Sequence, residues 1–113
     1  MVYTIIRGGK KGVVAMTTAQ ERKIEYIKKS IIATQVGERY AENYEFKEFK
    51  VYEEFGKVFI SISFGRKNDE NTMAQIYCRY YAFLSIGKRG AMEHYKKDKW
   101  TRTKYLFQAI TIL

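Results

Sequence analysis

The stretch GRKNDENTMAQIYCRYYAFLSIGKRG, residues 65–90, decides how this chain folds. From position 74 onward its even-numbered residues are almost all apolar, whereas the odd-numbered ones mix aromatic rings, polar groups and Arg79. Alternate side chains of a β-strand point to opposite sides, so this pattern indicates one strand with two different faces. We therefore predict a strand over residues 73–86, bent near Tyr80 because it is longer than most strands.

Patterns on the N-terminal side of this strand predict further strands. Residues 57–64 alternate strictly and give the cleanest strand pattern in the chain. Residues 44–55 indicate an edge strand with a bulge near Phe49, where the alternation fails. Residues 2–17 contain two short β-prone runs around a basic, glycine-rich turn at 7–12, which predicts a hairpin.

A helix is expected between this hairpin and the edge strand. Thr18 and Glu21 have the spacing of a capping box, in which the threonine hydroxyl accepts a backbone N–H and the glutamate reaches back. Gly37 is a suitable terminator, and residues 38–43 are expected to add a further turn. The apolar side chains that would face the core are Ile24, Ile27 and Ile31.

The C-terminal part of the chain has weaker patterns. Residues 91–97 are predicted to form a helix, and residues 103–113 fit either a helix or a strand. Residues 1–113 are expected to form a single domain of the α+β class. Its predicted architecture is an antiparallel β-sheet with a long N-terminal helix and a C-terminal helical segment packed on it.

The composition favours a basic, cytoplasmic protein. The chain has 21 Lys and Arg against 12 Asp and Glu, a net charge of +9, which favours nucleic acid, nucleotides or acidic proteins as partners. No apolar run reaches the length of a membrane span, and the N-terminus lacks the pattern of a signal peptide. Cys78 is the only cysteine, which excludes an internal disulfide and a cysteine-cluster metal site.

The sequence offers little for catalysis. His94, the only histidine, has one nearby acid and no neighbouring Ser or Cys, so a surface or helix-capping role is favoured over general-base work. Cys78 lies on the apolar strand face, which favours a buried hydrophobic side chain over a nucleophile. No His and Cys cluster has metal-ligand spacing, and no cofactor is indicated. We therefore expect a binding protein and not an enzyme.

Basic and aromatic side chains gather around residues 65–90 and indicate a nucleotide-like ligand. Aromatic rings beside Arg79 can stack on a base while the guanidinium neutralises a phosphate. Asn and Asp suit ribose hydroxyls or an adenine edge. The turn at residues 7–12 can also present N–H groups to an anion, although a plain basic turn is the favoured interpretation. The candidate ligand-binding residues are Arg66, Asn68, Asp69, Arg79, Tyr81, Phe83, Lys88 and Arg89.

The aromatic face of the predicted strands has a second interpretation. Phe59, Tyr77 and Tyr81 would expose a large apolar surface on a small monomer, so a helix or a second subunit is expected to cover them. We expect the protein to self-associate through this face. A ligand pocket lined by Arg79 and Phe83 would then form at the seam.

Four segments resemble the first family of phage anti-Thoeris proteins, the signal sponges. They are VYEEFGKVF at 51–59, KNDENTM at 67–73, the Cys78-Arg79 strand and IGKRG at 86–90. The resemblance implies a protein of similar size that forms dimers or larger assemblies. It also implies sequestration, without cleavage, of cyclic ADP-ribose isomers made by the TIR enzymes of bacterial Thoeris defence.

The same resemblance implies roles for individual residues. Phe83 would stack on adenine, and the pyrophosphate would be bound by Arg66, Arg79 or Arg89. Residues 107–113 lack arginine, which departs from any basic contact that the family makes from its C-terminus.

The sequence leaves alternative functions open. The first expectation is a phage anti-defence sponge for a cyclic ADP-ribose-type nucleotide signal, acting in the host cytoplasm. The alternative is a small basic nucleic-acid-binding protein that uses charge and stacking aromatics along an open sheet. A third possibility is an inhibitor that docks on an acidic enzyme surface.

Overall fold

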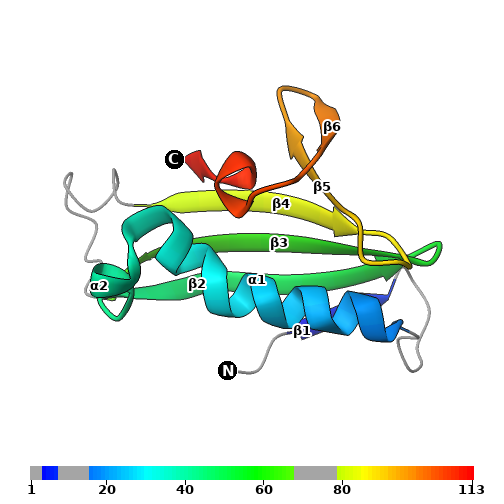
Figure 1. Ribbon diagram of the computed structural model, residues 1–113, viewed down its shortest axis with the longest axis horizontal. Coiled ribbons are helices and arrows are strands. Elements are labelled where there is room, and N and C mark those ends of the chain that lie inside the picture. The colour runs from blue at the N-terminus through cyan, green and yellow to red at the C-terminus, as the bar shows by residue number, and fades with distance from the viewer. Residues whose placement is uncertain (1–3, 8–15, 68–78) are drawn as a thin grey trace.

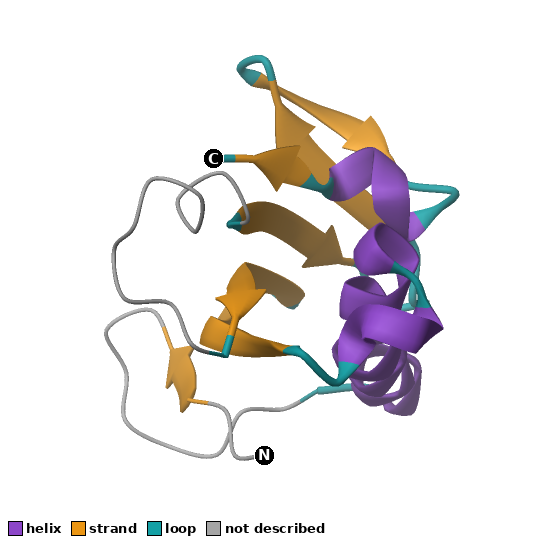
Figure 2. Ribbon diagram, turned by 90° about the vertical axis from the view of Figure 1, so that its left-hand side faces the viewer, coloured by secondary structure: helices purple, strands orange, loops and turns teal. Residues whose placement is uncertain are grey.

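A computed structural model of the chain describes residues 4–7, 16–67 and 79–113. One β-sheet forms the body of the molecule, and the helical elements lie against one of its faces (Figures 1 and 2). The helical elements are α1 (Thr18–Val36), α2 (Glu38–Ala41) and the 3-10 turn η1 (Leu106–Ala109). The strands are β1 (Thr4–Arg7), β2 (Tyr44–Glu54), β3 (Lys57–Arg66), β4 (Tyr80–Ile86), β5 (Met92–Lys96), β6 (Lys99–Arg102) and β7 (Thr111–Ile112).

The sheet confirms the predicted α+β class with a long helix packed on antiparallel strands. Its order is β1-β2-β3-β4-β5-β6, and β7 pairs with β4. Every described pair is antiparallel except β1 with β2, which run parallel. Because β2 has a neighbour on each side, the prediction that it is an edge strand was wrong. Residues 8–15 of the predicted hairpin lie outside the described residues, and Met16 and Thr17 belong to no strand.

The β2–β3 hairpin forms the centre of the sheet. The inward side chains of β3 are completely buried, which confirms the strand predicted over 57–64 and extends it to Arg66. Phe55 and Gly56 have φ values of 53° and 79°, the left-handed backbone that a tight hairpin turn requires at its two central positions. The register shifts between Phe46 and Glu48, slightly before the expected bulge position.

The start of α1 is fixed by a capping box one residue earlier than predicted. Thr17 Oγ1 accepts the Gln20 N–H at 3.2 Å, and Gln20 Oε1 accepts the Thr17 N–H at 3.0 Å. Gln20 replaces the predicted Glu21 because its amide also donates, through Nε2, to the carbonyls of Gly56 at 3.0 Å and Ile86 at 3.2 Å. A carboxylate could not make these two bonds to the sheet.

The C-terminal part of the chain departs most from the prediction. Residues 91–97 form no helix, because Met92 and His94 alternate inward along β5 and a turn at Lys97 and Asp98 returns the chain as β6. Both turn residues have positive φ, 53° and 61°. The predicted C-terminal helical segment is only the short 3-10 turn η1, followed by the two-residue strand β7.

The core lies between the sheet and the layer of α1 and η1. The predicted isoleucines of α1 are fully buried, and Leu106 and Ala109 of η1 join the same cluster. In β4 the even-numbered residues from Ala82 to Ile86 are buried, as expected; residues 73–78 of the predicted strand lie outside the described residues. Among the described helices, none has the length and apolar character needed to cross a membrane.

Candidate functional site

A cleft of about 800 Å³ lies at the end of the molecule that carries α2. Its walls come from the C-terminal end of α1, from α2, and from the adjoining ends of β2, β3 and β4. The polar and aromatic residues that line it are Gln35, Tyr40, Asn43, Tyr44, Arg66, Lys67 and Tyr80.

The aromatic wall of the cleft is held by the sheet register. Tyr44 lies opposite Arg66, and Phe64 lies opposite Tyr80, so these side chains project from the helix-covered face. The Tyr80 ring stacks on the fully buried Phe64 ring at 5.2 Å and 27°, and its centroid is 6.3 Å from that of Tyr44. The two tyrosine rings are therefore positioned before any ligand arrives.

Backbone hydrogen bonds join the loops on either side of the cleft. The Lys67 N–H donates to the Asn43 carbonyl at 3.0 Å, and the Asn43 N–H donates to the Tyr40 carbonyl at 3.0 Å. The end of β3 and the α2–β2 turn thus form one connected wall. Tyr40 remains exposed, with the Arg39 guanidinium 5.6 Å from its ring centroid.

These side chains suit a flat, negatively charged ligand. Arg66 and Lys67 are exposed and supply positive charge, and the Gln35 and Asn43 amides both donate and accept. The C-terminal end of α1 contributes partial negative charge at the opposite wall. An anionic group is therefore expected to lie toward Arg66 and Lys67, with a ring system against the tyrosines.

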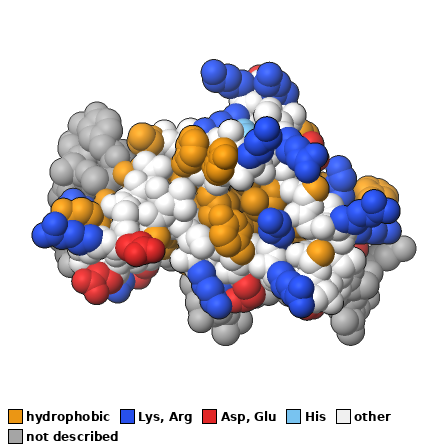
Figure 3. Space-filling view, viewed as in Figure 1, with side chains coloured by type: hydrophobic (Ala, Val, Ile, Leu, Met, Phe, Trp, Pro, Cys, Tyr) orange, Lys and Arg blue, Asp and Glu red, His pale blue; other side chains and the backbone are white. Residues whose placement is uncertain are grey.

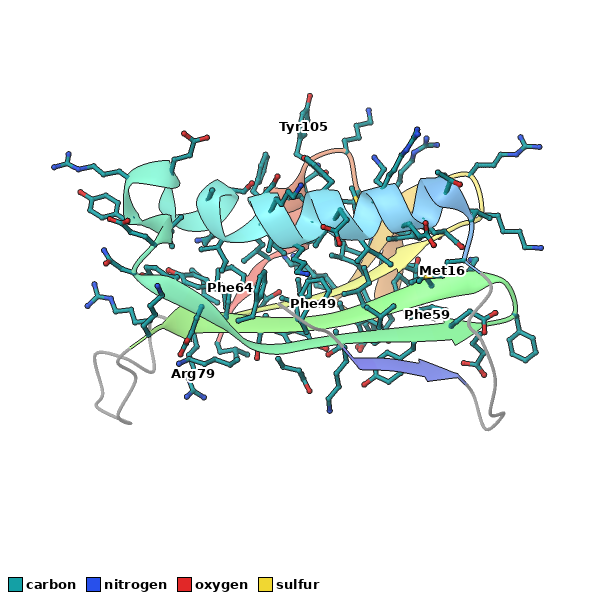
Figure 4. All side chains as sticks on the ribbon, turned by 90° about the horizontal axis from the view of Figure 1, so that it is seen from below. Met16, Phe49, Phe59, Phe64, Arg79 and Tyr105 are labelled. Carbon is teal, nitrogen blue, oxygen red and sulfur yellow. The ribbon has the colours of Figure 1, made fainter. Side chains whose placement is uncertain are left out.

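The structure distributes the predicted ligand residues over several places. Arg66 lines the cleft, whereas Arg79 precedes β4 and projects from the other face of the sheet (Figure 4). Lys88 and Arg89 lie beyond the opposite end of β4. At about 3.3 Å per residue, the two ends of this strand are about 20 Å apart. There the Thr17 hydroxyl donates to the Lys88 carbonyl at 2.7 Å. Asn68 and Asp69 lie outside the described residues.

Tyr81 and Phe83 belong to the open face of the sheet. Phe83 joins Phe59, Tyr95 and Trp100 in a cluster with ring centroids 5.3 to 6.4 Å apart, hereafter the outer aromatic cluster. A groove of about 370 Å³ beside it is lined by Tyr52 and Ser61 together with Phe59 and Phe83.

Two ion pairs lie on this open face. Lys50 Nζ lies 2.9 Å from Glu48 Oε1, and Lys57 Nζ lies 3.8 Å from Glu93 Oε1. The Glu48 carboxylate raises the pKa of Lys50, first by its hydrogen bond and then by its charge. These two pairs offset part of the positive charge on the open face.

His94 is buried on the inner side of β5, so the predicted surface or helix-capping role was wrong. Its Nδ1 lies 2.7 Å from Thr103 Oγ1. Burial, and then the charge of Lys96, hold the pKa of His94 below its usual 6.5. His94 does not line the cleft.

Sequence reasoning missed most of the cleft residues. Tyr80 was assigned to an apolar face and Tyr44 to the start of a strand, although both are tyrosines at strand ends, where a hydroxyl can reach solvent. Tyr95 and Trp100 were missed because residues 91–97 were predicted as a helix. Recognising the turn at Lys97 and Asp98 would have placed both rings opposite each other on one hairpin.

The sequence matches no family model, and neither a curated protein nor a solved structure matches the chain.

Proposed function

We propose that this protein binds and sequesters a nucleotide signal of the cyclic ADP-ribose type, in the cleft at the α2 end, without cleaving it. The observation that carries the proposal is the pairing of Arg66 and Lys67 with the positioned rings of Tyr44 and Tyr80. The class of ligand comes from the resemblance of residues 51–90 to the anti-Thoeris sponges. In a phage-infected cell the protein would act in the host cytoplasm.

The size and donor set of the cleft support a ligand of this class. About 800 Å³ falls within the range of small-molecule sites, which is roughly 300–1,000 Å³. Arg66 and Lys67 provide charge-assisted donors for a pyrophosphate, and a tyrosine ring provides a stacking surface for a base. Gln35 and Asn43 add amide groups that can read ribose hydroxyls or a base edge.

Binding without cleavage is supported by the chemistry of the cleft. Among the described residues that line it, none is a carboxylate, histidine, cysteine or serine that could act as a base or nucleophile. Among the described residues, no group of three or more His, Cys, Asp and Glu side chains could hold a metal ion.

Self-association through the open face belongs to the same proposal. The outer aromatic cluster leaves Tyr95 and Trp100 about 40% exposed, at 40% and 39%. Two copies of a chain of charge +9 repel each other unless the touching surfaces are locally balanced. The ion pairs of Lys50 and Lys57 provide such a balance around the aromatic rings.

Calorimetric titration with cyclic ADP-ribose isomers tests the location of the site. Arg66→Gln removes a charged phosphate donor, and such bonds are worth about 1.5–3 kcal/mol, so affinity should fall by at least about tenfold. Arg89→Gln is the matched control, because it makes the same charge change at the opposite end of β4.

The outcomes separate the two ends of the molecule. Weakening by Arg66→Gln with no effect of Arg89→Gln would support the cleft. The reverse pattern would place the ligand at the β4–β5 turn, and absence of binding by the parent protein would reject the function.

A further inference from the structure

Two aromatic rings at the start of η1, on its N-cap residue Tyr105 and on Phe107, stack on each other in solvent. The rings of Tyr105 and Phe107 have centroids 5.8 Å apart and planes 9° apart. Tyr105 is 62% exposed and Phe107 is 59% exposed, although Leu106 between them is buried in the core. Figure 4 shows Tyr105 projecting past α1, away from the sheet. These rings therefore do little to cover the core of the molecule.

Side-chain hydrogen bonds hold the backbone that presents these rings. Gln108 Oε1 accepts the Lys104 N–H at 2.9 Å and the Tyr105 N–H at 3.0 Å. Lys96 Nζ donates to the Ile110 carbonyl at 2.8 Å and so ties the end of η1 to β5. The ring pair is fixed on a short, anchored element and not on a free terminus, which lowers the entropy lost when a ligand stacks on it.

The surroundings of the ring pair are strongly basic. Between residues 96 and 104 the sequence is KKDKWTRTK, with five basic residues and one acidic residue. None of these basic side chains forms an ion pair with any residue in the part of the chain that the structure describes. Figure 3 shows hydrophobic side chains near η1 and Lys and Arg side chains over the β5–β6 hairpin beside it.

The strand register directs part of this charge toward η1. Lys96 lies opposite Lys99 on the hairpin, so both project from the same side, and Lys96 reaches the end of η1 from there. Trp100 lies on the other side of the hairpin, within the outer aromatic cluster. Lys99 and Lys104 thus accompany Tyr105 and Phe107, whereas the paired charges lie on the opposite face of the sheet.

We propose that Tyr105 and Phe107, together with Lys99 and Lys104, bind single-stranded nucleic acid without sequence preference. Parallel, exposed rings offer a stacking surface to bases of any type, and unpaired lysines beside them neutralise the backbone. An intact duplex hides its base faces from such rings. A polyanion also complements the charge of this surface better than a second copy of a chain of charge +9 does.

This surface is separate from the cleft and from the open sheet face. Neither Tyr105 nor Phe107 lines the cleft or the groove beside the outer aromatic cluster. The second function therefore does not depend on the nucleotide signal, and the two can be tested independently.

Fluorescence anisotropy with a labelled twelve-nucleotide oligothymidylate tests the proposal. Replacing both rings, Tyr105→Leu with Phe107→Leu, keeps apolar bulk but removes stacking, and should weaken binding by at least about tenfold. Phe55→Leu is the matched control, because Phe55 is 96% exposed on the β2–β3 turn, away from η1. Tyr105→Trp should retain binding. Lys99→Gln should reduce the dependence of affinity on salt.

Several results would overturn the proposal. In the first, the doubly substituted protein binds the oligothymidylate as tightly as the parent does. In the second, Phe55→Leu loses as much affinity as the double substitution. In the third, the parent binds a duplex of the same length as tightly as the single strand. In the fourth, the double substitution changes self-association, measured by light scattering, and leaves the affinity for the oligonucleotide unchanged. Arg66→Gln should leave oligonucleotide binding unchanged, so failure of either function is visible separately.

Discussion

Gln20→Leu is expected to destabilise the protein far more than a typical substitution near the start of a helix. Gln20 is 1% exposed, and its backbone and side chain together take part in four hydrogen bonds. Three of them use its side-chain amide: Oε1 accepts from Thr17, and Nε2 donates to the carbonyls of Gly56 and Ile86. Leucine keeps the helix propensity and the apolar stem but makes none of these bonds.

The magnitude follows from these three bonds. Each hydrogen bond contributes about 0.5–1.5 kcal/mol, and polar groups left buried without their partner cost more, so a loss of about 2–4 kcal/mol is expected. For a domain of this size that corresponds to a fall of roughly 8–16 °C in Tm. Thermal unfolding followed by circular dichroism measures the change.

Arg22→Leu is the control, because it introduces the same residue at an exposed position of α1 only two residues from Gln20. It should change stability by less than about 0.5 kcal/mol. If Gln20→Leu were as stable as Arg22→Leu, the attachment of α1 to the β2–β3 turn and β4 through this side chain would be refuted.

Three further predictions concern the pH dependence of stability, assembly through Trp100, and Phe83 on the open face of β4. The folded state holds the pKa of His94 below its usual value, so as pH falls below about 6.5 the unfolded chain protonates this imidazole more readily than the folded protein does. The free energy of unfolding should therefore decrease below about pH 6.5. Urea titrations at different pH values should show a smaller decrease for His94→Gln. Trp100→Ser should shift the protein toward monomer in light scattering coupled to size exclusion, whereas a parent protein that is already a strict monomer would reject assembly through the outer aromatic cluster. Phe83→Ala should likewise weaken assembly. If it lowered messenger affinity and left assembly unchanged, Phe83 would belong to the ligand site, as the sequence predicted.

Periodic patterns were sufficient to predict the elements that face the core on one side. Strict alternation in residues 57–64 and the isoleucines of α1 correspond to fully buried positions in the structure. Residues 91–97 were misassigned because a five-residue strand followed by a tight turn gives too short a pattern to distinguish from a helical turn.

Pairing between strands that are far apart in the chain was harder to predict from the sequence. The parallel contact of Thr4–Arg7 with β2 joins segments that are far apart in the chain, and no local signal specifies it. The same holds for the cleft, whose Tyr44, Arg66 and Tyr80 come together only through the register of three strands. Of the described cleft residues, only Arg66 was among the predicted ligand residues, because it adjoins the polar loop that starts at residue 67.

Capture and release of a messenger tests the central claim most directly. The protein is incubated with cyclic ADP-ribose isomers, separated from free nucleotide by filtration, heat-denatured, and the released material is identified by mass spectrometry. We expect the parent protein and Arg89→Gln to release near-stoichiometric, chemically unchanged messenger, and Arg66→Gln to release much less. Absence of captured messenger, or accumulation of a cleaved product with time, would contradict sequestration in the cleft.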